Sequence, residues 1–398
     1  TAQGGAVDIQ ADGTFVYTPA VGSTTTDTFT YTVTDGTAND NGTVTIDLAQ
    51  MVWYVDADAA AGGDGRSHTP LDSMPATVGG TEDIIHVGPS AVPLGGAGIV
   101  LAADQELIGA GVALELGGLQ LAPAATAPVI TSTADGVTLS DDNRVRGLEI
   151  GDTTGVGLRG SNFGLLTISD MAISGTGRAV LLDEGRIRDL PAATDRHFDS
   201  VTATLGNGAH HGLDIDGVGG LITFGRVAVS GNGHGVRLGG FPSPLRNVLI
   251  DSLDVDVTGV ALDAENHNEL TITNGTVDQE RLHSSAEQAL DLNNISSLLL
   301  TTDSLSSNFS GTGVSVSSTA GVLTVEGPTS IDSVATTAIV IDDGPDVTFG
   351  GPVQAAGRGG LRMTGGATTV SSTGGLQVSG TSFAGLEVGT GTTINVSG

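Results

Sequence analysis

Gly212-Leu213-Asp214-Ile215 and, 23 residues later, Gly235-Val236-Arg237-Leu238 show the pattern that decides the fold. Each stretch has a small residue, an apolar residue, any residue, and a second apolar residue. Eight more stretches repeat the pattern at intervals of 22 to 33 residues: Gly155-Val156-Gly157-Leu158, Ala179-Val180-Leu181-Leu182, Gly259-Val260-Ala261-Leu262, Ala289-Leu290-Asp291-Leu292, Gly313-Val314-Ser315-Val316, Ala338-Ile339-Val340-Ile341, Gly360-Leu361-Arg362-Met363 and Gly385-Leu386-Glu387-Val388.

The alternation inside each unit is that of a β-strand, with its two apolar residues on one face. Repeats of 20 to 50 residues indicate a solenoid, propeller or array. No unit carries a helical apolar stripe, and the Asn and fixed Leu ladder of leucine-rich repeats are absent. The pattern therefore predicts an all-β chain that winds into a parallel β-helix. The small residue before each strand is expected in a turn, where a Cβ would crowd the next coil.

The composition is that of an acidic chain without cysteine. Among 398 residues, 45 are Asp or Glu and all 14 basic residues are Arg, which gives a formal charge of −31. Nucleic acids and anionic membranes are repelled by this charge, whereas divalent cations are attracted. Acidity is also an expected adaptation to a saline or calcium-rich exterior. No apolar run reaches membrane-spanning length, so we expect no membrane insertion. Because the sequence begins at Thr1 without Met, we expect a processed product or a segment of a larger protein.

Residues 1–49 predict a first domain of about four strands. Alternating runs cover residues 6–10, 14–19, 27–36 and 42–48, and Ala11-Asp12-Gly13 is a hairpin signal between the first two. The sequences at 11–19, 29–36 and 43–46 resemble the later half of bacterial cadherin-like, immunoglobulin-fold repeats, which occur in tandem in large surface proteins. The resemblance implies a partial Ig-like β-sandwich and an extracellular bacterial location.

A complete sandwich of this kind has about seven strands. Four strands would leave an apolar face and strand edges open to association. Either earlier strands lie in an upstream segment, or another chain supplies them by β-augmentation.

Residues 50–398 predict the second domain. The run Val52-Trp53-Tyr54-Val55-Asp56, the Gly-rich turn at 62–65 and Thr69-Pro70-Leu71 resemble the start of pectin-lyase-like β-helices. That resemblance covers about 50–398 and implies a right-handed parallel β-helix, with Trp53 and Tyr54 closing the first coil. Residues 183–200 and 263–288 are insertions that we expect in surface loops. The last strand breaks off near Ile394 without a cap, and solenoids need caps, so we expect further chain or a partner there.

Stacking the units in register places outward side chains in columns about 4.8 Å apart. Asp214 is predicted beside Arg237, Arg159 beside Asp183, and His211 on the coil next to His234. The densest polar group consists of Asp214, Asp216, Arg237, His211 and His234. Paired carboxylates can serve as acid and base in glycoside hydrolysis, and Asp with Arg and Ca²⁺ can serve uronic-acid elimination.

The segment 233–239 looks like the Gly-His-Gly stretch of polygalacturonases. However, Ala209-His210-His211-Gly212 and Asn232-Gly233-His234-Gly235 stand where that family has Asn-Thr-Asp and Asp-Asp. No Arg-Ile-Lys follows at the expected place. The sequence therefore favours a solvated face with salt bridges over a catalytic site.

Calcium is the one cofactor that the composition suggests, because it needs several oxygen ligands within one loop. Asp56, Asp58 and Asp64 could supply them in the Gly-rich turn of the second domain. Asp35 and Asp40, with Asn39 and Asn41, could do so in the first domain. The spacing in both places differs from that of an EF-hand. His86, His197, His267 and His283 have no metal-ligand spacing.

Three functions fit these observations. The first is a structural or adhesive extracellular surface protein that joins a fibre or larger assembly by self-association or through further chain segments at both ends. The second is a polysaccharide lyase or glycoside hydrolase that acts on the face around Asp214 and Arg237. The third is a module that binds extracellular polysaccharide, but one Trp and three Tyr offer few stacking surfaces. The open ends and the missing catalytic motif favour the first.

Overall fold

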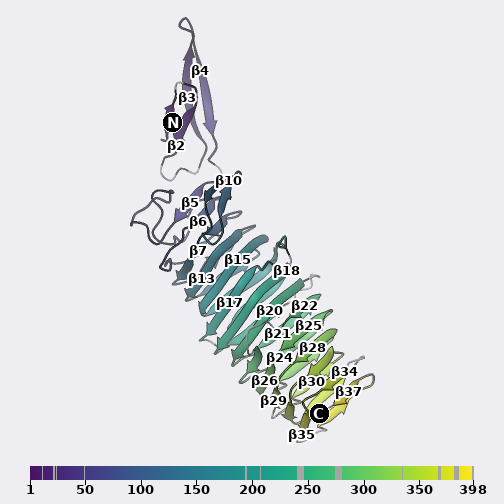
Figure 1. Cartoon of the computed structure of the whole chain (residues 1–398). Helices are drawn as coiled ribbons and strands as arrows, with labels where there is room; N and C mark the ends of the chain where they lie inside the picture. Colours follow the sequence, from purple (N-terminus) through teal and green to yellow (C-terminus); the bar gives the residue numbers. More distant parts are fainter. Residues whose placement is uncertain are drawn as a thin grey trace.

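The computed structural model describes residues 1–398 except 11, 21–22, 24, 49, 193–194, 207, 240–245, 274–279, 310, 334, 366–368, 381–384 and 397–398. Over this part of the chain there are strands and turns and no helix, so the all-β prediction is confirmed. No helix within it is long and apolar enough to cross a membrane. A small N-terminal region stands at one end of a long column of stacked strands (Figure 1).

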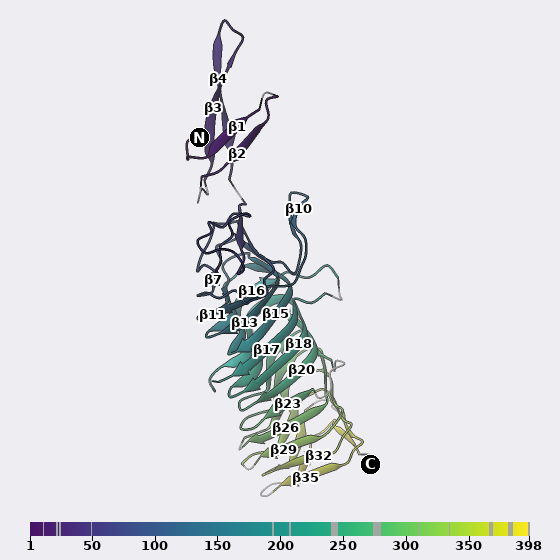
Figure 2. The ribbon, with the colours of Figure 1, turned by 60° about the vertical axis from the view of Figure 1, so that its left-hand side comes forward.

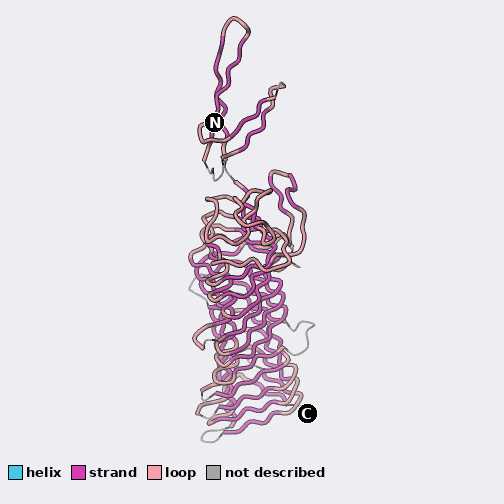
Figure 3. The backbone as a smooth tube through the Cα atoms, turned by 90° about the vertical axis from the view of Figure 1, so that its left-hand side faces the viewer, coloured by secondary structure: helices cyan, strands magenta, loops and turns pink. Residues whose placement is uncertain are grey.

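The column is a parallel β-solenoid with three faces, as the repeat predicts. Face A contains twelve strands that pair in parallel, one per coil, and Figure 3 shows the coils along the column. These strands are β7 (Ile99–Val100), β12 (Val137–Thr138), β14 (Val156–Ser161), β16 (Arg178–Ile187), the start of β18 (His211–Gly231), β19 (His234–Gly239), β21 (Leu262–His267), β24 (Leu290–Ile295), β27 (Val314–Ser317), β30 (Ile339–Asp342), β33 (Leu361–Thr364) and β36 (Leu386–Val388).

Faces B and C complete each coil, and the longest strands bend from one face into the next. Face B is made by β5 (Val52–Val55), β6 (Ile84–Val87), β8 (Glu106–Gly109), the starts of β13 (Arg144–Thr153), β15 (Leu165–Thr176) and β20 (Arg246–Val257), the end of β16, the middle of β18, β22 (Glu269–Ile272), β25 (Leu298–Thr302), β28 (Gly321–Val325), β31 (Asp346–Phe349), β34 (Thr369–Ser372) and β37 (Thr393–Val396). Face C is made by β11 (Val129–Ser132), the ends of β13, β15, β18 and β20, β17 (Phe198–Leu205), β23 (Arg281–Ser284), β26 (Ser304–Phe309), β29 (Thr329–Ser333), β32 (Val353–Gly357) and β35 (Leu376–Gly380).

Inward side chains form a single aliphatic core along the column. Leu213, Val236, Leu262 and Leu290 stack on one another from coil to coil, and each is fully buried. Adjacent coils lie about 4.8 Å apart, so each side chain packs against its equivalents above and below. Burial of this surface is the main stabilising term of the column.

One corner repeats from coil to coil and holds the faces in register. At the corner between face A and face B, one residue of the chain has a positive φ, between 48° and 82°. This is found in eight coils, at Asn162, Glu184, Gly217, Asn266, Asn294, Ser318, Asp343 and Gly365. Left-handed backbone costs most L-residues roughly 1–2 kcal/mol, and Gly, Asn and Asp tolerate it best. Asn294 also donates its amide to Asn266 on the adjacent coil, at 2.7 Å.

The first coils close their corner differently. In three successive coils a left-handed acidic residue is followed by a buried polar residue whose side chain accepts the amide three positions earlier. The pairs are Glu82-Asp83, Asp104-Gln105 and Asp142-Asn143. Each buried side chain thus satisfies a turn amide that stacking alone would leave unpaired.

The register that the repeat predicts is right in eight of the ten units and wrong in two. In the first, Leu158 rather than Val156 stacks on Val180. In the fifth, Leu262 rather than Val260 stacks on Val236. A shift of two residues keeps the same side chains inward, so the apolar pattern alone cannot distinguish the two registers.

This shift changes two predicted neighbours. Arg159 lies beside Leu181 rather than Asp183, and its guanidinium pairs with Asp135 of the preceding coil. Arg237 stacks on Asp263 rather than Ala261.

The N-terminal region contains the four predicted strands, as two separate antiparallel ribbons (Figure 2). They are β1 (Ala6–Ile9) with β2 (Phe15–Thr18), and β3 (Asp27–Thr34) with β4 (Asn39–Ile46). Phe15 and Phe29 join the ribbons edge to face, with ring centroids 5.3 Å apart. Asp27 is fully buried and accepts the Tyr17 hydroxyl at 2.9 Å. Ala11 of the predicted hairpin signal lies outside the described residues.

The side chains of Trp53 and Tyr54 point to opposite sides of β5, the first strand of the column. Trp53 packs over Gly65 and Gly79 and donates its indole N–H to Asp83 at 2.9 Å. Tyr54 points outward, so the prediction that it closes the coil is wrong. It packs in a second small core between face B and the hairpin of β9 (Leu114–Leu116) and β10 (Leu119–Ala122). Successive strand residues point to opposite faces, which forces this division.

We expect Leu238→Ala to lower the free energy of unfolding by about 2–5 kcal/mol, because Leu238 is fully buried between coils. The same substitution at Leu299, which is 44% exposed, should cost less than about 0.5 kcal/mol. Urea denaturation followed by circular dichroism measures both. Equal losses in the two variants would contradict the assignment of the face A interior as core.

Candidate functional site

The five polar residues predicted on one face do come together on face A. Strand pairing places Asp214 opposite Arg237 and His211 opposite His234 on adjacent coils. Arg237 reaches two carboxylates, with Nη1 3.3 Å from Oδ1 of Asp214 and Nη2 2.8 Å from Oδ2 of Asp216. The group forms because β16, β18 and β19 pair in parallel, one per coil.

Arg178 is a further member that the sequence pattern missed. It lies one coil before His211, in the same column, and its Nη2 is 2.7 Å from Oδ2 of Asp214. Asp214 is therefore held between two guanidiniums and is only 5% exposed. Arg178 stands just before the repeat unit that begins at Ala179, so the repeat pattern did not include it. Its pairing with Asp214, 36 residues later, depends on how the two coils stack.

The two histidines stack on each other, with ring centroids 4.7 Å apart and planes at 27°. Burial, with His234 and Arg237 nearby, lowers the pKa of His211 to about 4. Nδ1 of His234 accepts the amide of Val260 at 3.0 Å. A neutral His234 consequently carries its proton on Nε2.

Asp263 is the second residue that sequence reasoning missed at this site. It follows Arg237 in the outward column, a position that the predicted register gave to Ala261. Burial and, after it, the charges of Asp291 and Glu265 raise the pKa of Asp263 to about 6, against the opposing effect of Arg237. Burial also raises the pKa of Asp214, against the effect of its two arginines. Asp263 is thus a carboxyl that can hold a proton near neutral pH.

The prediction that the insertions at 183–200 and 263–288 are surface loops is wrong for much of their length. Residues 183–187 and 198–200 belong to β16 and β17, and 263–288 includes most of β21 and all of β22 and β23. Arg196 makes a two-pronged pair with Asp251, at 2.7 and 2.9 Å, and His197 is fully buried with Nδ1 2.8 Å from the Thr223 hydroxyl. Residues 193–194 of the first insertion and 274–279 of the second lie outside the described part of the chain.

The predicted calcium residues bind the backbone and nearby side chains in this structure. Asp56 accepts the amide of Asp58 at 2.9 Å, and Asp64 accepts the hydroxyl of Thr69. Asp35 accepts the amides of Thr37 and Ala38, both at 2.8 Å, and Asp40 accepts that of Asn41 at 2.9 Å. Among the described residues, no three His, Asp or Glu side chains are placed to hold a metal ion. Calcium binding stays a prediction.

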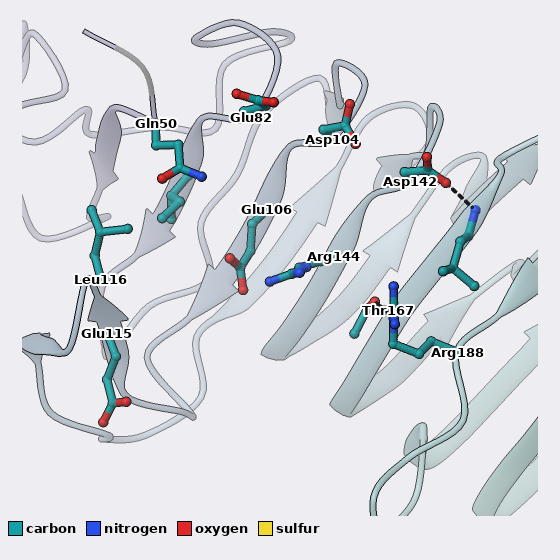
Figure 4. Close-up of a pocket in the computed structure, with 13 residues that line it drawn as sticks. Gln50, Glu82, Asp104, Glu106, Glu115, Leu116, Asp142, Arg144, Thr167 and Arg188 are labelled. Carbon is teal, nitrogen blue, oxygen red and sulfur yellow. Dashed lines mark hydrogen bonds between the residues drawn. The ribbon is translucent and has the colours of Figure 1, made fainter. Parts of the chain in front are cut away.

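A cleft of about 460 Å³ lies elsewhere, on the outside of face B beside the β9–β10 hairpin (Figure 4). Carboxylates of the first three corners follow one rim, and Arg144 and Arg188 lie across from them. Sequence reasoning missed this cleft. The signal was present in the repeated pairs of an acidic residue and a following polar residue at 82–83, 104–105 and 142–143, but their intervals of 22 and 38 residues hide the stacking.

Comparison with known proteins finds one similarity. The family model of the bacterial Ig domain matches residues 1–47. This match supports the Ig-like part of the predicted fold. The comparison with curated proteins found no match, and the comparison with solved structures found none either.

We expect Asp263→Asn to stabilise the fold near pH 7.5 by about 1 kcal/mol, allowing for solvent screening. The folded-state pKa of Asp263 is raised to about 6, so its ionised form weakens the folded state above that pH. The gain should be small near pH 4 and grow as the pH rises to about 6, because over this range the unfolded chain loses the proton that folded Asp263 keeps. Urea unfolding between pH 4 and 8 measures it. Exposed Asp332, changed to Asn, is the control, and a pH-independent gain would contradict the assignment.

Proposed function

We propose that this chain is a structural or adhesive part of an extracellular bacterial surface protein and works without catalysis. The observation that carries the proposal is a rod with one aliphatic core through twelve coils, joined to a region that matches the bacterial Ig domain. Domains of that family are typical of extracellular or surface proteins. A stacked solenoid gives length and stiffness and presents extended surfaces to partners.

The polar group on face A supports a mechanical role. Asp214 is clamped by Arg178 from one adjacent coil and by Arg237 from the other. The three side chains tie three successive coils together. A carboxylate held in this way is poorly placed to take a proton from a substrate, because both of its oxygens already accept hydrogen bonds.

Association with other chains is part of the proposal. Ile9, Phe15 and Val33 of the N-terminal ribbons are 54%, 42% and 54% exposed. Each ribbon has two strands, and within the described residues no third strand pairs with either. Open edges and apolar faces favour β-augmentation by a second copy or by further chain. Extracellular polysaccharide and calcium remain proposed partners.

A second candidate function is a polysaccharide lyase or glycoside hydrolase on face A. The specific observation in its favour is Asp263, whose raised pKa keeps part of it protonated near neutral pH. A protonated carboxyl one coil from Arg237 and two coils from Asp214 is the kind of general acid that glycoside cleavage uses.

We expect the chain to form concentration-dependent oligomers in sedimentation velocity runs with Ca²⁺ present. Replacing Ile9 and Val33 by Asp should shift the distribution toward monomer, since both lie on the exposed apolar side of their ribbons. Thr30→Asp, on the opposite side of β3, is the matched control. A chain that stays monomeric at high concentration would rule out self-association through these ribbons.

We expect pectin, alginate and related glycans to be left uncleaved in assays for reducing ends and unsaturated products. Activity that disappears in both Asp214→Asn and Asp263→Asn would establish the enzyme and overturn the non-catalytic proposal. Circular dichroism of each variant controls for loss of fold.

A further inference from the structure

The cleft on face B has a floor made of one outward side chain per coil. Strand pairing places Ile84, Glu106, Arg144 and Thr167 opposite one another in that order. Arg188 comes next, because its Nε donates to the Thr167 hydroxyl at 3.2 Å. Four coil steps of about 4.8 Å make the floor about 19 Å long.

The β9–β10 hairpin forms a fixed wall at one end of this floor. Leu114 of the hairpin is fully buried and packs with Ile84 and Ile108 in the small outer core, and Leu116 packs against it. Figure 4 shows Glu115 and Leu116 on this side of the cleft. The wall is held by apolar packing, so a ligand meets a surface that is already formed.

The charges in the cleft are divided between its two ends. In chain order, Glu82 and Asp104 precede β6 and β8 and Glu115 belongs to the hairpin, whereas Arg144 and Arg188 belong to later coils. Figure 4 shows Glu82, Asp104 and Asp142 along one rim, with Arg144 and Arg188 across from it. Over the described part of the chain, no hydrogen bond or ion pair engages the side chains of Glu82, Asp104, Glu115 or Arg144. The coil spacing keeps these opposite charges apart, unlike those of the Arg178–Asp214–Arg237 group.

The remaining carboxylates of the cleft are occupied. Glu106 is 2.8 Å from Nε of Arg146, and Asp142 accepts the amide of Leu165 at 2.6 Å. The guanidinium of Arg146 offsets the charge of Glu106, whereas a hydrogen bond from an amide leaves Asp142 its negative charge. The hairpin end therefore carries the carboxylates Glu82, Asp104 and Glu115, and the far end carries two arginines and one carboxylate, so the net charge is negative at the hairpin end and positive at the far end.

We propose that this cleft binds an extended peptide segment of a partner protein, with basic side chains at one end and acidic side chains at the other. The inference rests on the proposed adhesive role and specifies its ligand. The basic side chains of the peptide contact Glu82, Asp104 and Glu115, and its acidic side chains contact Arg144 and Arg188. An extended chain rises about 3.3 Å per residue, so about six residues span the floor.

A peptide suits the cleft better than a glycan does. Among the residues that the structure describes, none of those lining the cleft is Trp, Tyr, Phe or His, and such rings are the usual stacking surface for apolar sugar faces. Leu116 and Ile84 offer aliphatic contact instead. Charge complementarity of this kind sets the orientation and selectivity of a bound segment.

Fluorescence anisotropy of the full chain with a labelled peptide, Lys-Lys-Gly-Ser-Gly-Glu-Glu, tests the proposal. The double variants Glu82→Gln/Asp104→Asn and Arg144→Gln/Arg188→Gln should each weaken binding about tenfold. Asn keeps the left-handed backbone favourable at position 104. Asp332→Asn/Glu387→Gln removes two exposed carboxylates far from the cleft and should leave binding unchanged.

The charge-reversed variant Arg144→Glu/Arg188→Glu should prefer an all-lysine peptide to the mixed one. Equal binding of the mixed and all-lysine peptides by the unaltered chain would show general attraction to its negative charge and overturn the proposal. So would binding of an oligosaccharide with amino and carboxylate groups but no peptide. Neither result would contradict the proposed structural, non-catalytic role of the chain. The glycan-cleavage assays test the lack of catalysis independently of peptide binding.

Discussion

Everything in this molecule depends on the stacking of inward aliphatic side chains at the spacing of one coil. Leu213, Val236, Leu262 and Leu290 must lie above one another for the core to fill, and tight packing tolerates little misplacement. Outward residues on the same strands then fall into columns with the same spacing. The Arg178–Asp214–Arg237 group and the row from Glu106 to Arg188 are both products of this one constraint.

Much of the fold could be predicted from the sequence. Apolar residues that alternate with period two, and a small residue before each such strand, indicate stacked strands. What the pattern could not settle was register. Val260 and Leu262 are two residues apart, so both have the parity of an inward residue. The stacking of Leu262 between Val236 and Leu290 is what sets the register. Because of this register, Asp263 rather than Ala261 lies next to Arg237 on face A. Arg178 and the cleft residues were hidden for the same reason, since their neighbours come from coils of irregular length.

The carboxylates of the face A group and those of the face B cleft differ in their partners. On face A the arginines and aspartates satisfy one another across coils, and partial burial strengthens each pair. In the face B cleft, Glu82 and Asp104 point away from a left-handed corner whose following residue already closes the turn. The first arrangement holds coils together. The second leaves charge available to an outside group, at the end of the rod nearest to the Ig-like ribbons (Figures 1 and 2).

The left-handed corner that recurs in eight coils gives the solenoid a constant axial step. Adding or deleting one whole repeat would change the separation of two surface features by about 4.8 Å while leaving the lateral direction of each nearly unaltered. Gene duplication within the repeat could therefore adjust the reach of such a protein in small, equal increments. A sandwich or barrel offers no comparable route, because an extra strand there alters the whole closed shape.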